Sequence, residues 1–301
     1  MKVVYNMRCD IITGDCEQFL KGKLSERFDL TFLDPPFNQN KKYSMHNDDM
    51  LELEYWKWMN RVCNLIFKHT SEGGAIYFMQ REKNAEFVLQ TLRQTGWTFQ
   101  NLVIWKKKTS AIPSPKRFGK HHQIIAFATK GKTPRVFNKL RIDPPLLTTE
   151  KHRRPNGMYV TDVWDDIREL TSGYFAGDEP LRFENGERVH KQQSPVKLLA
   201  RIILSSSNVG DMVFDPFAGT GTTLVAAKQL QRNSLGIELD PGNTSFIEDR
   251  LSRIRDSDNI QKCRNDYIFT ENLDDIFPLQ VRTGKIGQIQ IQTEMDSYIT
   301  A

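Results

Sequence analysis

One short segment combines a carboxylate, two prolines and an aromatic ring directly after an apolar run. Asp34-Pro35-Pro36-Phe37 follows Phe28–Leu33, whose composition predicts a buried strand that ends at the proline pair. Asp34 can receive a proton, and Pro35 fixes the loop while leaving its carbonyl available as an acceptor. Phe37 offers a flat face for stacking. Together these groups suit an exocyclic amine of a nucleobase, because two acceptors on the amine hydrogens would localise the nitrogen lone pair.

The chain contains a second Asp-Pro-Pro segment with a different context. Asp143-Pro144-Pro145-Leu146 lacks the aromatic residue and lies in an irregular region, which predicts a surface turn. The first copy follows a strand, so we expect its side chains at the carboxyl edge of a sheet. Because a base inside a duplex cannot reach such a loop, the chemistry requires a base that has been flipped out.

A glycine turn lies where another predicted strand, Met212–Phe214, leads into a helix. Gly219 and Gly221 allow a sharp turn and a close approach of the backbone to a ligand. Asp215 opens the turn and would repel a pyrophosphate, whereas it suits a cationic ligand such as a sulfonium or an ammonium. Leu224 also stands where a dinucleotide-binding fingerprint has its third glycine. The turn therefore indicates S-adenosylmethionine, and the alternative is a turn that only packs a helix on the sheet.

Strand and helix patterns alternate through most of the chain, which predicts an α/β sheet with helices on both faces. Further strands are expected at 74–79, 102–105, 123–128 and 234–239, and helices at 48–70, 85–92 and 224–230. Ser194-Pro195 predicts a helix start, with the hydroxyl as N-cap and proline at the first helical position. Glu238 ends the strand at 234–239 and could accept hydrogen bonds from both ribose hydroxyls of an adenosine. No regular period is found in 131–190, and the tail after Asp256 is polar and uninformative.

Composition narrows the class of protein. A chain of 301 residues can form one large domain, or one domain with an insertion. No apolar run could cross a bilayer, the N-terminus has no signal-peptide pattern, and the four cysteines show no metal-ligand spacing. We therefore expect a protein of the prokaryotic cytoplasm with no membrane contact and no metal.

The net charge of +5 is unevenly distributed. The segment 106–154 holds 14 lysines and arginines against only two acidic residues, which leaves the rest of the chain net acidic. A single basic block indicates a polyanion-binding face, and the alternative is a solvated loop rich in lysine.

Taken together, the two motifs resemble those of the DNA amino-methyltransferases that modify adenine N6 or cytosine N4. Asp34–Phe37 resembles the catalytic motif of that family, and Asp215–Gly221 resembles its cofactor motif. The order of catalytic loop, irregular insert and cofactor turn is similar to that of the beta group, found in type II restriction-modification. The resemblance implies a Rossmann-like, S-adenosylmethionine-dependent methyltransferase fold that is circularly permuted. It further implies a mostly parallel seven-stranded sheet with one antiparallel strand, and a target-recognition insert.

The resemblance also divides the chain into four parts. Residues 1–130 would form the catalytic half of the methyltransferase domain and 131–190 the target-recognition insert. Residues 191–256 would form the cofactor-binding half, and 257–301 a C-terminal extension of unknown role.

Two further segments resemble motifs that line the cofactor pocket in this family. Lys191-Gln192-Gln193-Ser194-Pro195 resembles the motif that lines the methionine end, and Gly14-Asp15-Cys16 resembles the motif whose carboxylate contacts adenine. Asp15 could equally be a turn residue. Relatives often have a His-Glu pair where this chain has His121-His122-Gln123, so we assign no base-binding role there. The expected cofactor-binding residues are Asp15, Asp34, Lys191, Ser194, Pro195, Asp215, Phe217, Ala218, Gly219, Thr220, Gly221, Thr222 and Glu238.

The basic block would then hold double-stranded DNA. Lysines and arginines on phosphates position a duplex without reading its sequence, whereas arginines in the insert could contact guanine. The expected phosphate contacts are Lys106, Lys107, Lys108, Lys116 and Arg117. The candidate base readers are Arg135, Arg141, Arg153, Arg154 and Arg168. The resemblance adds a cognate restriction endonuclease and a homodimer as candidate partners.

The expected reaction is site-specific transfer of a methyl group from S-adenosylmethionine to adenine N6. Asp at the first position of the loop resembles the adenine-modifying members, whereas Ser there would indicate cytosine. The alternatives are N4-cytosine methylation, methylation of an RNA or protein amine, and a DNA-binding module without activity. Both motifs are intact, which disfavours the last of these.

Overall fold

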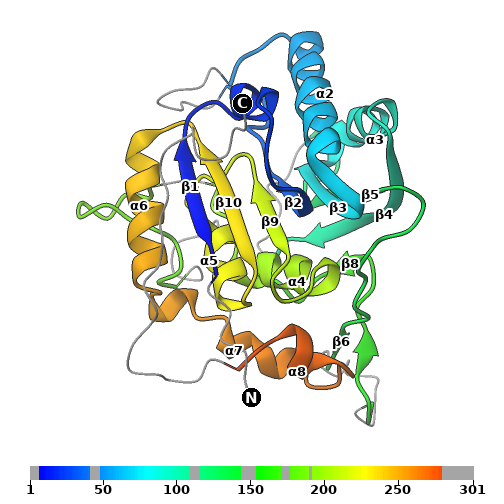
Figure 1. Ribbon diagram of the computed structural model, residues 1–301, viewed down its shortest axis with the longest axis vertical. Coiled ribbons are helices and arrows are strands. Elements are labelled where there is room, and N and C mark those ends of the chain that lie inside the picture. The colour runs from blue at the N-terminus through cyan, green and yellow to red at the C-terminus, as the bar shows by residue number, and fades with distance from the viewer. Residues whose placement is uncertain are drawn as a thin grey trace.

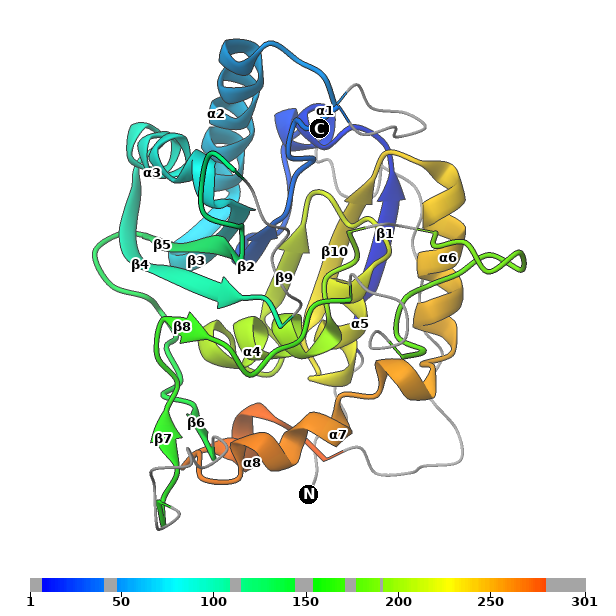
Figure 2. The ribbon, with the colours of Figure 1, turned by 180° about the vertical axis from the view of Figure 1, so that it is seen from behind.

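A computed structural model describes residues 7–40, 48–108, 115–143, 154–170, 177–189 and 192–279. Its centre is an eight-stranded sheet in the order β1-β10-β9-β2-β3-β5-β4-β8, with helices on both faces (Figures 1 and 2). Strand β5 is antiparallel to both of its neighbours, and the other pairs are parallel. The predicted α/β fold with one antiparallel strand is confirmed. The expected number of seven strands was one too few, because the insert adds the short strand β8 at the edge.

The strands of this sheet are β1 (Cys9–Thr13), β2 (Phe28–Leu33), β3 (Thr70–Arg81), β4 (Trp97–Lys106), β5 (His122–Lys130), β8 (Val163–Trp164), β9 (Met212–Asp215) and β10 (Asn233–Glu238). A separate hairpin pairs β6 (Arg141–Ile142) with β7 (Met158–Tyr159). The helices are α1 (Cys16–Lys21), α2 (Glu52–His69), α3 (Ala85–Gln94), α4 (Val196–Ser206), α5 (Thr222–Gln229), α6 (Pro241–Ser252), α7 (Gln261–Arg264) and α8 (Leu273–Ile276). None of the described helices is both long and apolar enough to cross a membrane.

All the strands and helices expected from the sequence are present, and several described elements were not expected, among them β1, α1 and α6. Strand β1 has only five residues, and the buried Asp10 at its second position interrupts the apolar pattern. Helix α1 has only six residues. Helix α6 buries Ile247 and Leu251 but is otherwise polar, so its apolar face is too narrow to detect.

The start of α4 differs from the expected cap. Pro195 itself is the capping residue, with an extended backbone at φ −65° and ψ 142°, and no side chain caps the helix. The amide of Val196 instead donates to a carboxylate oxygen of Glu179 at 2.5 Å. Burial raises the pKa of Glu179 to about 7. The hydroxyl of Ser194 is therefore available for another partner.

The polar segment after Asp256 turns out to pack on the core. Tyr267 and Phe277 are fully buried in the same cluster as α4 and α5. The guanidinium of Arg201 donates to the Tyr267 hydroxyl at 3.1 Å, and that of Arg232 donates to the carbonyl of Ile276 at 2.6 Å. The described part of the extension thus completes one face of the sheet, which its hydropathy had not indicated.

Candidate active site

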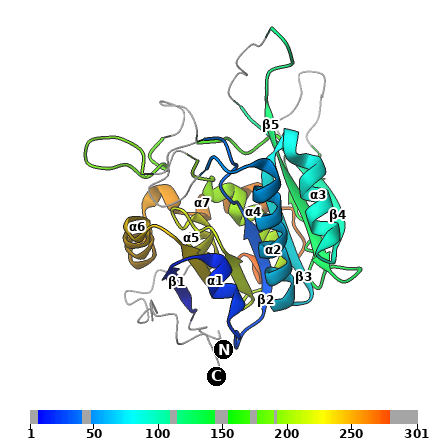
Figure 3. The ribbon, with the colours of Figure 1, turned by 90° about the horizontal axis from the view of Figure 1, so that it is seen from above.

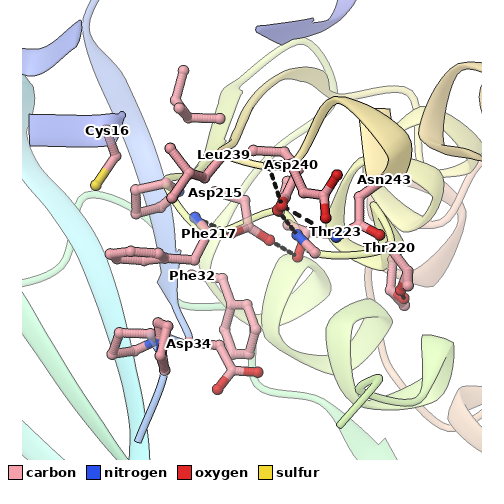
Figure 4. A pocket seen from close by; sticks show the side chains of 18 of the residues that line it. Cys16, Phe32, Asp34, Asp215, Phe217, Thr220, Thr223, Leu239, Asp240 and Asn243 are labelled. Atoms are coloured by element: carbon pink, nitrogen blue, oxygen red, sulfur yellow. Dashed lines mark hydrogen bonds between the residues drawn. The ribbon is translucent and has the colours of Figure 1, made fainter. Parts of the chain in front are cut away.

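The main candidate site is a cavity at the carboxyl ends of β1, β2, β9 and β10. Its lining joins the Asp34 loop, the glycine turn, the end of β10 and the segment before α4. Figure 4 shows Asp34 at one end of this cavity and Asp240 and Asn243 at the other. This is the edge at which open α/β sheets bind their ligands.

Sheet topology brings the two sequence motifs together. Strand β2 pairs with β9, so that Leu30 lies opposite Val213 and Thr31 opposite Phe214. The loop that starts at Asp34 and the turn that starts at Asp215 therefore leave neighbouring strands at the same edge. Strand β10 lies on the other side of β9 and adds Glu238 to the same cavity.

The Asp34 loop is held from both sides. The hydroxyl of Ser194 donates to Oδ2 of Asp34 at 3.3 Å, which connects the loop to the segment before α4. The hydroxyl of Tyr55 donates to the carbonyl of Pro36 at 2.8 Å, and the side chain of Gln80 donates to that hydroxyl at 2.9 Å. Sequence patterns placed Tyr55 only on the apolar face of a helix, so its second role was missed.

Phe37 does not lie where the sequence suggested. Its side chain is only 4% exposed and belongs to the hydrophobic core cluster on the α4 side of the sheet. It is not among the described residues that line the cavity. The expectation that this ring presents a free stacking face is therefore wrong for this conformation.

The glycine turn needs glycine for two different reasons. Gly219 and Gly221 have φ of +56° and +74°, a left-handed conformation that side chains with a Cβ disfavour. A Cβ at Gly221 would also lie 2.7 Å from the side chain of Ile247 in α6. The turn thus fixes both the path of the chain and the close packing of α6 beside the cavity.

One buried and one half-buried carboxylate shape the turn. Asp215 accepts hydrogen bonds from the amide of Phe217 at 3.1 Å and from the hydroxyl of Thr223 at 2.5 Å. Glu238 accepts one from the amide of Gly219 at 2.7 Å. Burial raises the pKa of Asp215 to about 7 and also raises that of Glu238. Each group therefore gains from a nearby positive charge that restores its ionised form.

A buried ion pair supports the same turn from outside the cavity. The guanidinium of Arg250 donates to the carbonyl of Thr220 and, at 3.3 Å, to the hydroxyl of Thr222. Its other nitrogens donate to both oxygens of Asp258 at 3.1 and 2.8 Å. Both side chains are almost completely buried. Sequence reasoning missed this pair because both residues lie in a segment that has no motif.

Charge determines what the cavity can hold. Its described lining contains the carboxylates of Asp15, Asp34, Asp215, Glu238 and Asp240, and no lysine, arginine or histidine. A phosphate or pyrophosphate would find no cationic partner there, whereas a cationic ligand would be attracted. Within the described residues, no group of histidine, cysteine and acidic side chains has a metal-binding arrangement.

The remaining expected cofactor residues divide into three groups. Phe217, Ala218, Gly219, Thr220 and Thr222 line the cavity, whereas Pro195 and Gly221 support it from outside the lining. Asp15 lines the cavity, and its carboxylate also caps α1 by accepting from the amide of Gln18 at 2.9 Å. Lys191 lies outside the described residues. Asn243 was missed; it lines the cavity and donates to Glu238 at 3.2 Å.

Comparison with known proteins identifies the family. A profile described as "DNA methylase", for the N6 and N4 enzymes, matches residues 28–248. The chain belongs to the N6/N4 DNA methylase family. This confirms the resemblance to the DNA amino-methyltransferases seen in the two motifs.

Curated relatives of this family member include two type II methyltransferases. M.HinfI of Haemophilus influenzae is 30% identical over 269 residues, covering 83% of this chain and 70% of the relative. M.BamHI of Bacillus amyloliquefaciens is 30% identical over 259 residues, covering 80% of this chain. The chain spans only 56% of the length of M.BamHI.

Solved structures show the same fold. The M1.HpyAVI–SAM complex has a TM-score of 0.54 at 22% identity, covering 81% of this chain and 99% of that one. The PvuII DNA methyltransferase, described as cytosine-N4-specific, has a TM-score of 0.59 at 17% identity, covering 90% and 97%. At these identities the likeness concerns the fold alone.

A DNA methylase must hold DNA beside its cavity, so the basic residues at the same edge of the sheet are the ones to consider for DNA contacts. Lys106, Lys108, Lys116 and Arg117 are exposed on β4 or in the loop between β4 and β5. Lys107, which was also expected to contact phosphate, has internal partners in this structure. Its ammonium lies 3.5 Å from the centre of the Trp105 ring and donates to the Gln123 side chain. Burial lowers the pKa of Lys107 to about 8, and the carboxylates of Glu169 and Asp34 oppose that shift.

Three candidate base readers lie at the wrong end of the sheet. Arg135 forms ion pairs with Asp29 at 3.3 Å and Asp211 at 2.5 Å, where β2 and β9 begin. Arg141 stacks on Tyr159 in the β6–β7 hairpin, with 4.2 Å to the ring centre. Figures 1 and 2 show this hairpin at the end opposite to the tip of β1. The exposed Arg154 precedes the same hairpin strand, and Arg153 lies outside the described residues.

The later part of the insert reaches the catalytic edge. Trp164 of β8 pairs with Trp105 near the end of β4, and the exposed Arg168 follows it. Further along, the amide of Leu181 donates at 2.9 Å to the side chain of Gln193, which lines the cavity. The adjacent Arg182 and Arg188 were not among the expected base readers. Their position beside the cavity makes them candidates that sequence order alone did not indicate.

Proposed function

We propose that the chain transfers a methyl group from S-adenosylmethionine to the N6 amine of a flipped-out adenine in double-stranded DNA. One observation carries this proposal. A single acidic cavity joins the Asp34 loop to the glycine turn, at the sheet edge from which the basic β4–β5 loop also leaves.

The residues of the cavity fit the cofactor. When bound, S-adenosylmethionine supplies a methyl group made electrophilic by its sulfonium. The buried Asp215 can receive a positively charged ligand, which would restore its ionised form. Glu238 and Asp15 are suited to the ribose and adenine ends, because carboxylate oxygens have acceptor positions left beside their internal bonds. Ser194 and Gln193 would line the methionine end.

The Asp34 loop would act on the target amine. The Asp34 carboxylate and the carbonyl of Pro35 would accept the two amine hydrogens, which localises the nitrogen lone pair in the direction of the cavity. The proton lost from the methylated amine would pass to Asp34, directly or through water. The hydroxyl of Ser194 donates to Oδ2 of that carboxylate and so restricts its rotation beside the cavity.

Adenine is preferred over cytosine because of the first residue of the loop. Asp34 resembles the adenine-modifying members, as described above. The chemistry at the amine is the same for cytosine N4, so the N4-cytosine reaction is the second candidate.

Direct product analysis tests the proposal. Purified protein would be incubated with methyl-labelled S-adenosylmethionine and unmethylated genomic DNA, followed by digestion to nucleosides and mass spectrometry. Labelled N6-methyladenine is expected, and labelled N4-methylcytosine would replace the adenine assignment. Label found only in RNA or protein supplied in parallel would overturn the DNA assignment as a whole.

Two partner predictions go with this function. The type II relatives suggest a cognate restriction endonuclease, which a digestion of methylated and unmethylated DNA by host extract would reveal. A homodimer is expected from the beta-group resemblance, and sedimentation of the purified chain would measure it.

A further inference from the structure

Phe118 is the most solvent-exposed of the large apolar side chains in the described part of the chain. Its ring is 99% exposed, whereas the next in order, Leu51, is 78% exposed. Phenylalanine normally gains from burial, so a fully exposed ring at a loop tip suggests an apolar partner that arrives with a ligand.

The loop that carries Phe118 leaves the sheet at the catalytic edge. Leu33, the last residue before Asp34, lies opposite Phe78 of β3. Further along the same strand Arg81 lies opposite Gln123, and His122 lies opposite Lys106. The β4–β5 loop therefore leaves at the same edge as the Asp34 loop. Its base lies two strand spacings to the side, or about 10 Å, and three residues, or about 10 Å, further along the strand direction. Figure 3 shows segment 115–121 projecting from the start of β5 beyond the body of the molecule.

Positive charges flank the ring. Lys116 and Arg117 precede it and are exposed, and Lys120 follows it. The ammonium of Lys120 forms an ion pair with Glu82 at 3.2 Å, which holds the base of the loop against the end of β3. Apolar side chains can insert between the base pairs of a step, and cations beside them can bind the phosphates that flank that step.

We propose that Phe118 enters the base stack of the duplex at the position from which the target base is flipped out, while Lys116 and Arg117 hold the flanking phosphates. The inference rests on the proposed function. Extrusion of a base leaves its former partner and neighbours unstacked, and an aromatic ring can take over that stacking. Phe37 cannot supply this ring, because its side chain is buried in the core. Phe118 would thus favour the flipped state from outside the cavity.

The test compares paired and mispaired target bases. Phe118→Ala would be assayed on a duplex that carries the mapped methylation sequence, and on the same duplex with a mismatch at the target base. A mispaired base costs less to extrude, so it needs the ring less. We expect kcat/KM on the matched duplex to fall about 10- to 100-fold, with recovery to within about threefold of wild type on the mismatch.

Matched variants separate this role from others. Phe118→Trp should keep activity because it preserves a stacking face. Phe99→Ala, which removes an exposed ring elsewhere on β4, should leave kcat/KM unchanged on both duplexes. Arg117→Gln should lower binding to both duplexes and reduce its salt dependence, which Phe118→Ala should not do. The fluorescence of 2-aminopurine at the target position should rise with wild type and rise much less with Phe118→Ala.

Two results would overturn the inference. The first is equal loss of activity on matched and mismatched duplexes, with cofactor binding intact. The second is full activity of Phe118→Ala on the matched duplex. If the wild type itself transfers no methyl group to any DNA, the proposed function fails instead.

Discussion

The hydroxyl of Ser194 donates a hydrogen bond to Oδ2 of Asp34 at 3.3 Å, across 160 positions of the chain. This contact connects the catalytic loop with the segment that lines the cofactor end of the cavity. It also orients the Asp34 carboxylate, because the hydrogen bond restricts rotation of that group. The two halves of the site are thus joined at the residue on which the proposed reaction depends.

Asp34→Asn should abolish most turnover while keeping cofactor binding. Asparagine has nearly the same shape but offers only one acceptor and cannot take the proton. We expect kcat to fall about 10²- to 10⁴-fold with the affinity for S-adenosylmethionine changed by less than about threefold. Single-turnover kinetics and calorimetry would measure the two quantities.

Asp143→Asn is the matched control for that variant. Asp143 begins the second Asp-Pro-Pro segment and is exposed. Its substitution should leave kcat unchanged. Retention of full activity by Asp34→Asn would refute the mechanism.

Cofactor affinity should rise with pH through about pH 7. Burial raises the pKa of Asp215 to about 7, so the carboxylate is largely neutral at pH 6 and ionised at pH 8. A cationic ligand binds the ionised form, and the raised pKa of Glu238 acts in the same direction. We expect binding of S-adenosylmethionine to be about tenfold weaker at pH 6 than at pH 8.

Two comparisons check that assignment. Asp215→Asn should flatten the pH dependence, and S-adenosylhomocysteine should show a smaller one because it lacks the sulfonium charge. An unchanged pH profile in Asp215→Asn would assign the effect to other groups.

Lys108 and Lys107 should differ in their effect on DNA binding. Lys108 is exposed, whereas the ammonium of Lys107 lies on Trp105 and bonds to Gln123. Lys108→Gln should lower the slope of log affinity against log salt by about one. Lys107→Gln should leave that slope unchanged. Equal slopes for the two variants, measured by fluorescence anisotropy, would contradict this assignment.

Gly221→Ala should destabilise the fold more than Gly186→Ala. Both glycines have positive φ, +74° and +83°, so both variants strain the backbone by about 1–2 kcal/mol. Only at Gly221 would the new Cβ collide with Ile247, which raises its total cost to about 2–5 kcal/mol. Urea denaturation would measure the free energies of unfolding. Equal decreases in the free energy of unfolding would show that α6 moves to accommodate the added methyl group.

Local sequence patterns predicted the parts of the site that depend on local chemistry. The Asp34 loop and the glycine turn each follow a buried strand, and such a strand is recognisable from its own residues. The acidic opening of the turn indicated a cationic ligand, and the cavity contains the carboxylates to match. The alternation of strands and helices likewise predicted the α/β sheet.

Other features depend on contacts that no local pattern encodes. Hydrophobic period predicts which face of a helix is buried but not what its hydroxyl groups reach, so the bond from Tyr55 to Pro36 was missed. Arg250 and Asp258 form a buried pair beneath the glycine turn, although both belong to polar sequence. The burial of Phe37 could not be predicted either, because it depends on packing in the same core cluster as α4, which is distant in the sequence.

The sequence by itself determined the two chemical motifs, the family they resemble and the excess of positive charge in one block. Only the tertiary structure decided which of those charges lie beside the cavity. The antiparallel strand β5 returns the chain to the amino ends of the parallel strands, so the insert begins there and Arg135 pairs with Asp29 and Asp211. The sequence gives the position of each charge along the chain. It does not give the edge of the sheet at which that charge lies, because this depends on the direction of the preceding strand.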